Sequence, residues 1–355
     1  MNIPNVDEFV QLTHRLKATG TWRESVHVFD GRSAQAIRAA LASGRPLLVR
    51  GEPGTGKSQL ARAAAKVLNR RFMSQVVDAH TEIQDLWYRF DAVSRLGNAQ
   101  VLSVTGKEKD VEKELEPERY LSPGILWWAF AWEDAAKRKC NHPLFQADET
   151  TDAQKGVVLL LDEIDKADAD LPNSLLETLD NGKFTVPWIN QTIGVNDTDE
   201  IPRPLVIITT NEDRQLPGAF VRRCLVLDLS LPKKEPALIK HLIERATFHF
   251  PKTVNTDKDT LAIERDEAGQ LVDQSRFDTD VLIEAASQLY QDRVEAEGLG
   301  VTPPGQAEYL DMLRVLDELA PEGKERQLAL LSMIKDFALK KYPGMQQSTE
   351  PDIDE

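Results

Sequence analysis

The sequence predicts an α/β fold: a parallel sheet sandwiched by helices, followed by a separate all-helical domain. In the first half of the chain, short apolar runs alternate with helical segments, which is typical of a parallel sheet covered on both faces. From Pro232 onward, apolar residues recur at helical spacing instead. The length of 355 residues exceeds the usual size of one domain, so two domains are expected.

Five apolar runs are the predicted strands of the sheet. The third of them, Val157–Leu161, contains only valine and leucine, as expected of a central strand that is buried on both faces. Between the third and fourth runs, Phe184–Trp188 begins a predicted hairpin that has Asn196 and Asp197 as turn residues. The five predicted strands are residues 46–49, 72–77, 157–161, 205–210 and 225–229.

The predicted domain boundaries follow from these patterns and from shifts in composition. The segment Lys107–Arg119 is dense in both charge signs, so it reads as a solvated loop or a short exposed helix. The polar, acidic end of the chain is expected to be disordered. The predicted parts are an N-terminal helix or linker over 1–24, an α/β domain over 25–232 with insertions near 97–120 and 184–204, a helical domain over 233–342 and an acidic tail over 343–355.

Composition limits the classes of function. The chain is 41% hydrophobic and 28% charged, which is the balance of a globular protein. Its net charge of −15 argues against a generic nucleic-acid scaffold, although a local basic groove stays open. The two cysteines, Cys140 and Cys224, form no disulfide framework. No signal-like segment opens the chain and no apolar run could span a bilayer, so we expect a cytoplasmic protein with no membrane partner.

A glycine-rich segment follows the first strand. It reads G-x-x-x-x-G-K-S and precedes a helical stretch, which is the strand–turn–helix context of a phosphate-binding P-loop. Glycines let backbone N–H groups close around a polyphosphate, and the helix N-terminus adds its positive end. Lys57 is placed to reach the β- and γ-phosphates, and the Ser58 hydroxyl to ligate Mg²⁺. The predicted nucleotide-binding residues are Gly51, Glu52, Pro53, Gly54, Thr55, Gly56, Lys57, Ser58 and Gln59.

Two adjacent acids, Asp162 and Glu163, follow the third strand. Functional groups of an open parallel sheet lie at the carboxyl ends of its strands, which is also where the P-loop begins. Asp162 is therefore predicted to hold the magnesium ion and Glu163 to orient and polarise the attacking water. The alternative is that both acids favour the N-terminus of the next helix.

Two further strand and helix ends carry candidate residues. Asn211 ends the fourth strand, where a neutral amide could bind the γ-phosphate or the lytic water; otherwise it is a turn residue. Arg222 and Arg223 end a short helical segment before the fifth strand. Arginine suits phosphate because its planar donors match the phosphate oxygens, but arginine at a helix C-terminus also simply favours the helix dipole.

This set of motifs resembles the AAA+ ATPases over about residues 25–340. Within them, Leu216–Arg223 and Tyr120–Leu126 resemble segments of the MoxR type. The resemblance implies an AAA+ core with a C-terminal helical lid, ATP and Mg²⁺ as cofactors, and a homohexameric ring that remodels a protein client. It makes Arg223 the arginine finger and Arg222 its helper, and it places both insertions near the central pore.

The same resemblance raises the question of partners and of a missing residue. MoxR-type proteins often act beside a von Willebrand A-domain protein, whose D-x-S-x-S pattern this chain lacks, so the chain would supply only the motor. The lid position that often carries a sensor 2 arginine reads Pro304–Ala307, and Arg314 is the candidate replacement.

Two alternatives remain. Thr210–Arg214 is similar to a segment of the McrB restriction GTPase, which implies a nucleotide-driven motor subunit of a nucleic-acid restriction or defence complex. A non-hydrolysing scaffold is disfavoured because Lys57, Asp162 and Glu163 are all present.

Overall fold

The computed structural model describes residues 3–10, 12–105, 111–138, 155–195, 202–252, 260–262, 275–321 and 323–339. Its internal contacts divide the chain into two compact units. The first comprises Met1–Val6, Gly31–Val49 and Ala61–Leu227. The second comprises Asp7–Asp30, Arg50–Leu60 and Asp228–Glu355, so the P-loop groups with the C-terminal helices.

The first unit is built on a five-stranded parallel sheet, which confirms the predicted fold class. The order β11-β3-β10-β7-β4 is not the order along the chain, as in a doubly wound sheet. In the centre, Leu205 of β10 is opposite Val158 of β7 in a parallel register. All five predicted runs are strands: β3 (Leu47–Arg50), β4 (Arg71–Val76), β7 (Val157–Asp162), β10 (Leu205–Thr210) and β11 (Leu225–Asp228).

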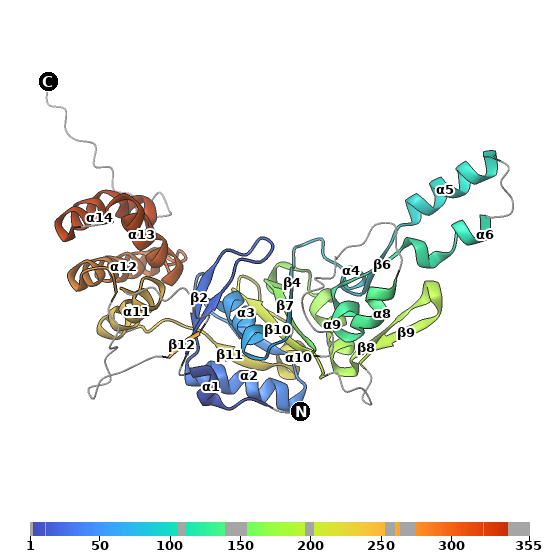
Figure 1. Ribbon diagram of the computed structural model, residues 1–355, viewed down its shortest axis with the longest axis horizontal. Coiled ribbons are helices and arrows are strands. Elements are labelled where there is room, and N and C mark those ends of the chain that lie inside the picture. The colour runs from blue at the N-terminus through green and yellow to red at the C-terminus, as the bar shows by residue number, and fades with distance from the viewer. Residues whose placement is uncertain are drawn as a thin grey trace, which may run out of the picture. The chain divides into compact units, whose positions relative to one another are not determined.

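Helices pack around this sheet (Figure 1). The central strands are apolar because both of their faces are covered; Leu159 and Ile207 are fully buried, as are Trp127 and Phe220 from the surrounding helices. The helices of this part are α2 (Gly31–Ser43), α3 (Lys57–Val67), α4 (Ile83–Trp87), α7 (Ile125–Phe130), α8 (Trp132–Lys137), α9 (Asp170–Asn181) and α10 (Gly218–Arg223).

The insertions fold into small elements of their own. The predicted hairpin is present: β8 (Lys183–Val186) pairs with β9 (Gln191–Gly194) through a 3-10 turn at Pro187–Ile189. The proposed turn residues Asn196 and Asp197 lie outside the described residues. Near the charged segment, the structure has β5 (Tyr88–Phe90), α5 (Ala92–Thr105), α6 (Val111–Glu114), a 3-10 turn at Pro117–Tyr120 and β6 (Leu121–Pro123).

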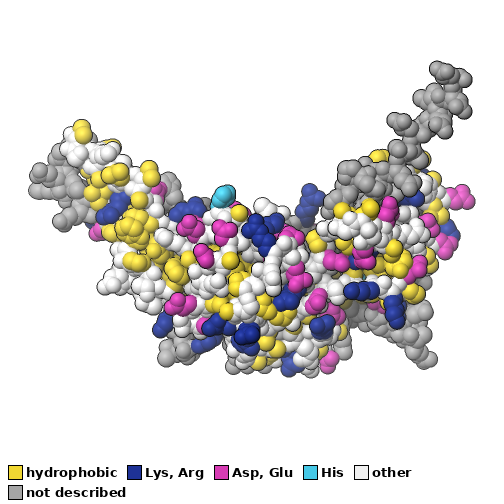
Figure 2. Space-filling view, turned by 180° about the vertical axis from the view of Figure 1, so that it is seen from behind, with side chains coloured by type: hydrophobic (Ala, Val, Ile, Leu, Met, Phe, Trp, Pro, Cys, Tyr) yellow, Lys and Arg dark blue, Asp and Glu magenta, His cyan; other side chains and the backbone are white. Residues whose placement is uncertain are grey.

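The α5 helix carries an exposed apolar face. Val93, Leu96, Val101 and Val104 are between 60% and 86% exposed. Figure 2 shows hydrophobic side chains gathered over this end of the first unit. Soluble proteins rarely expose contiguous apolar patches, so this face of α5 is a candidate contact surface.

The second unit contains the predicted helical domain. Its helices are α11 (Glu235–His249), α12 (Thr279–Leu299), α13 (Gln306–Leu319) and α14 (Lys324–Ala338), and they share a core that includes Leu242, Leu289 and Leu313. Figure 1 shows these four helices gathered in one bundle. No helix within the described ranges is both long and apolar enough to cross a membrane.

Helix α1 (Val6–Val10) lies in the segment 1–24, for which a helix or linker was predicted. The three-stranded antiparallel sheet that follows was not predicted. It is ordered β12-β1-β2 and is formed by β1 (Leu12–Leu16), β2 (Ser25–Val28) and β12 (Thr260–Ala262). The predicted acidic tail over 343–355 and Cys140 lie outside the described residues.

Candidate active site

The P-loop connects β3 to α3. Gly51, Gly54 and Gly56 have φ values of +142°, +76° and +91°, which residues with a side chain rarely adopt. At Gly51 a Cβ atom would also lie 2.3 Å from the carbonyl oxygen of Leu229. The loop therefore needs glycine at this position for both its conformation and its packing.

Lys57 is the first residue of α3, and its side chain folds back onto the loop. The residue is 7% exposed, and its Nζ donates to the carbonyl oxygens of Gly51 and Glu52 at 2.7 and 2.8 Å. The Thr55 hydroxyl also donates to the Glu52 carbonyl, at 2.9 Å. These hydrogen bonds hold a buried ammonium group inside the loop.

The other predicted nucleotide-binding residues lie in the same stretch. Ser58 and Gln59 are in the first turn of α3, and the Gln59 Oε1 accepts a hydrogen bond from Ser25 Oγ at 2.9 Å. A glycine-built loop, a buried lysine and the N-terminus of an 11-residue helix together suit a polyphosphate. The residues present thus fit a nucleoside triphosphate.

Asp162 and Glu163 leave the carboxyl end of β7 and share one hydrogen-bonding partner. The Thr209 hydroxyl donates to Asp162 Oδ1 at 2.5 Å and accepts from the Glu163 backbone N–H at 3.0 Å. Thr209 lies in the neighbouring strand β10 and is completely buried. This residue was missed; the available signal was a threonine pair at the end of an otherwise apolar strand.

The carboxylate of Glu163 has two partners of its own. Lys166 Nζ lies 2.5 Å from one oxygen, and Asn211 Nδ2 lies 3.4 Å from the other. The hydrogen bond to Glu163 raises the pKa of Lys166. The structure thus brings Glu163 and Asn211 together, and it adds Lys166, which the sequence did not single out.

The backbone around these acids is unusual. Among the described residues, four other than glycine have positive φ: Asn69, Asn190, Glu163 and Glu212. Asparagine tolerates this conformation, but glutamate rarely adopts it. Glu163 (φ +61°) follows β7 and Glu212 (φ +62°) follows β10 by two residues, so the strain lies at the carboxyl edge of the sheet. Such outliers concentrate at functional sites.

The two arginines lie at the end of α10, where both are exposed. Arg223 Nε forms an ion pair with Asp180 at 2.8 Å, and its carbonyl oxygen accepts from Arg45 Nε at 2.9 Å. Within the described residues, Arg222 has no ion pair. Arg223, which is the predicted arginine finger, is thus paired with Asp180 of the same chain.

The lid carries a different arginine from the ones considered above. At the sensor 2 position, Gly305 caps α13, and Arg314 pairs with Asp311 on the same helix. The buried Arg293 of α12, by contrast, contacts the P-loop residue Glu52 at 2.8 Å. The signal for Arg293 was its position on the apolar face of α12, four residues after Leu289.

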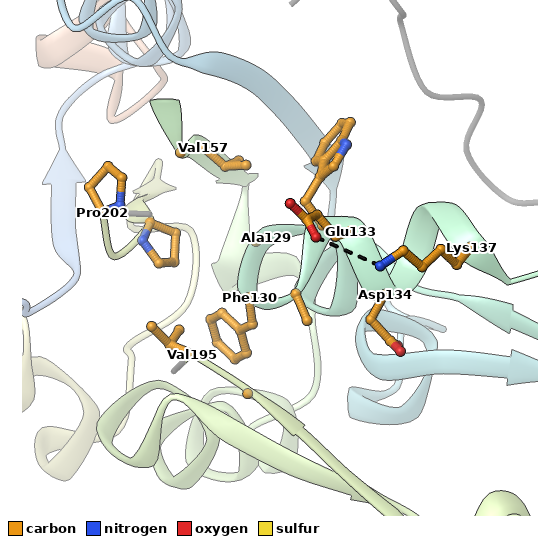
Figure 3. A pocket seen from close by; sticks show the side chains of 13 residues that line it. Ala129, Phe130, Glu133, Asp134, Lys137, Val157, Val195 and Pro202 are labelled. Atoms are coloured by element: carbon orange, nitrogen blue, oxygen red, sulfur yellow. Dashed lines mark ion pairs between the residues drawn. The ribbon is translucent and has the colours of Figure 1, made fainter. Parts of the chain in front are cut away.

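A cavity of about 240 Å³ lies elsewhere in the first unit (Figure 3). It is lined by Phe130, Trp132, Val157 and Pro202, and Glu133 and Lys137 form an ion pair beside it. Val157 begins β7, so the cavity is at the opposite end of that strand from Asp162. It contains none of the predicted site residues.

The predicted magnesium site has few protein ligands. No group of three or more His, Cys, Asp or Glu side chains within the described ranges could hold a metal ion by itself. Mg²⁺ at a nucleotide site is held by one or two protein oxygens together with phosphate and water. The Ser58 hydroxyl and the Asp162 carboxylate are hard oxygen ligands of this kind and fit that ion.

Comparison with known proteins assigns the family. Two of the similar solved structures are C. elegans PCH-2 and a protein of Cytophaga hutchinsonii described as a candidate ATPase. PCH-2 is 17% identical, with a TM-score of 0.36, and the match covers 87% of this chain and 69% of that one. The second protein is 14% identical, with a TM-score of 0.36, and the match covers 86% of this chain and 79% of that one. Neither likeness is strong enough to carry an activity over, and no curated protein matches. The profile of the AAA domain (dynein-related subfamily) matches residues 46–224, half of the chain. Because this match runs from β3 to the end of α10, the chain belongs to the AAA+ ATPases, in the dynein-related subfamily.

Proposed function

We propose that this protein is an ATP-hydrolysing motor of the MoxR type, which assembles into a ring and remodels a protein client. The observation that carries the proposal is the arrangement of Glu163. Its carboxylate accepts hydrogen bonds from Asn211 and Lys166, and its backbone is tied through Thr209 to Asp162. A carboxylate fixed in this way beside a metal-ligand candidate suits a general base.

The motifs support a common site. The P-loop follows β3, and Asp162, Glu163 and Asn211 stand at the ends of β7 and β10, which are neighbouring strands. The P-loop would hold the triphosphate through its backbone N–H groups and Lys57. A magnesium ion bound by Ser58 and Asp162 would neutralise charge on the phosphates. Glu163 would accept the proton of the attacking water, and Asn211 would fix the orientation of the Glu163 carboxylate.

The exposed arginines support the proposed ring. Arg222 and Arg223 end α10 on the surface, where a second copy of the chain could receive them. An arginine that reaches the γ-phosphate of a neighbour completes a site only when the ring forms. A homohexamer acting on a protein client, with a von Willebrand A-domain protein as partner, is the assembly that we propose.

The test is ATP hydrolysis by the purified protein and two variants. Lys57→Ala should lose binding of labelled ATP, because it removes the buried charge of the loop. Glu163→Gln keeps the size and hydrogen-bonding capacity but loses basicity, so binding should survive while turnover falls by at least about 100-fold. Wild-type turnover in Glu163→Gln would mean that another residue is the base.

The same assay separates the proposed motor from the restriction-type alternative. A protein remodeller should prefer ATP and respond to its client, whereas the alternative predicts a preference for GTP and stimulation by DNA. Hydrolysis of GTP with strong stimulation by duplex DNA would therefore replace the proposed function.

A further inference from the structure

We propose that Arg293 in the lid is a specificity residue: it neutralises the carboxylate of Glu52 in the P-loop and so lets the loop accept a polyphosphate. This inference rests on the proposed nucleotide binding and goes beyond it, because it assigns a role to an ion pair between loop and lid. Both residues belong to the second unit.

One nitrogen of Arg293 contacts both carboxylate oxygens of Glu52, and the arginine end of this ion pair is buried. Arg293 Nη2 lies 3.1 and 2.8 Å from the two carboxylate oxygens of Glu52. The Arg293 side chain is 9% exposed and that of Glu52 is 35% exposed. The other end of the guanidinium donates to the Pro304 carbonyl at 2.7 Å, which fixes its orientation. Glu297, at 4.0 Å, is mostly exposed and thus a weaker partner.

Close packing around this ion pair leaves little room for rearrangement. A Cβ atom at Gly305 would lie 2.8 Å from the Pro53 carbonyl oxygen, and one at Gly54 would lie 2.9 Å from Ala307 Cβ. The start of α13 therefore rests directly on the P-loop. The contact is made by small residues and by Arg293, at the lid segment where a sensor 2 arginine was expected and is absent.

The charge balance explains why the loop needs Arg293. The backbone carbonyl of Glu52 accepts hydrogen bonds from Lys57 Nζ and Thr55 Oγ1. The carboxylate of Glu52 is therefore carried by a residue that directly contacts Lys57, the proposed phosphate-binding lysine. An unpaired negative charge there would repel a polyphosphate. Paired with Arg293, Glu52 contributes almost no net charge.

The experiment compares three ligands that share one base but differ in charge: adenosine, ADP and ATP. Arg293→Gln keeps a hydrogen-bonding side chain but removes the charge, so ATP affinity should fall about tenfold, which corresponds to about 1.4 kcal/mol. ADP affinity should fall less, and adenosine affinity should stay unchanged. Dissociation constants are measured by competition with a fluorescent nucleotide, with circular dichroism confirming the fold of each variant.

A second substitution tests the charge argument directly. In Glu52→Gln the carboxylate is gone and Arg293 keeps its positive charge, so ATP should bind more tightly than to the wild type. In the double variant, ATP affinity should return to within about threefold of the wild-type value. The matched control is Arg276→Gln, which breaks another ion pair of the lid and should leave all three affinities unchanged. In that pair, Arg276 Nη1 contacts both carboxylate oxygens of Asp317, at 3.2 and 2.9 Å.

The possible results are distinct. Equal weakening of adenosine and ATP in Arg293→Gln would show that Arg293 only supports lid packing, which overturns the inference. A weaker ATP affinity in Glu52→Gln, or no recovery in the double variant, would overturn it as well, even if Arg293→Gln failed to fold. A wild-type protein that binds no ATP would refute the proposed function itself and this inference with it.

Discussion

Replacing Thr209 by valine removes one hydroxyl group and preserves the shape of the side chain. Two hydrogen bonds are lost: the one that Thr209 donates to the Asp162 carboxylate at 2.5 Å and the one that it accepts from the Glu163 N–H at 3.0 Å. Hydrogen bonds to charged groups contribute about 1.5–3 kcal/mol and neutral ones about 1 kcal/mol. Since no cavity forms, the expected loss is about 3 kcal/mol in the free energy of unfolding of the first unit.

The assay is urea unfolding followed by circular dichroism, together with ATP turnover. Turnover should fall with stability, because Asp162 and Glu163 lose their shared support. Two control variants separate the loss of the Thr209 hydroxyl from other effects of the substitution. Thr209→Ser keeps the hydroxyl and should retain most of both properties. Thr210→Val alters the adjacent threonine, which is equally buried but accepts only from the Glu212 N–H at 2.9 Å, so it should lose about 1 kcal/mol.

The reasoning would be refuted by a Thr209→Val protein with wild-type stability and turnover. It would also be refuted if Thr209→Ser were as impaired as Thr209→Val, because the defect would then come from a missing methyl group.

Three further predictions follow from the geometry. Gly51→Ala should abolish ATP binding and destabilise the second unit by about 1–3 kcal/mol, since its Cβ would lie 2.3 Å from a carbonyl oxygen; wild-type affinity in equilibrium dialysis would contradict this. Burial and two nearby arginines lower the pKa of His249 to about 4, so the neutral form is favoured in the folded protein and stability should be lost as pH falls from about 6.5 to 4. The loss should be about 3 kcal/mol, and in His249→Asn the free energy of unfolding should change less between pH 6.5 and 4. Finally, mixing Arg223→Ala with Lys57→Ala should recover part of the ATPase activity if Arg223 acts on a neighbouring subunit; with subunit exchange confirmed by labelling, no recovery would rule out that role.

The sheet was predictable because its strands are encoded locally. Strands buried on both faces, such as β7 and β10, must be apolar along their whole length, and the P-loop has a fixed spacing. The small sheet of β1, β2 and β12 was missed for the opposite reason. Its strands mix polar and apolar residues, and β12 comes from a segment more than 200 residues away from β1.

The candidate site was predictable to the same extent. Asp162, Glu163 and Asn211 could be placed because each directly follows a recognisable strand. Thr209, Lys166 and Arg293 were not identified, since weak signals such as a threonine pair at a strand end do not show what a side chain contacts. Which of the two arginines of α10 pairs with Asp180 also depends on side-chain geometry that no spacing encodes.

The left-handed backbone of Glu163 has a consequence for protein engineering. Glycine or asparagine would adopt this conformation at a lower free energy, by about 1 kcal/mol, because the glutamate side chain crowds its own backbone there. A library of variants at position 163 that is selected only for thermal stability should therefore enrich glycine and asparagine. The selected proteins should be more stable but should not hydrolyse ATP. Glu212 has nearly the same backbone conformation and no proposed chemical role, so the same gain could be sought there without removing the proposed base.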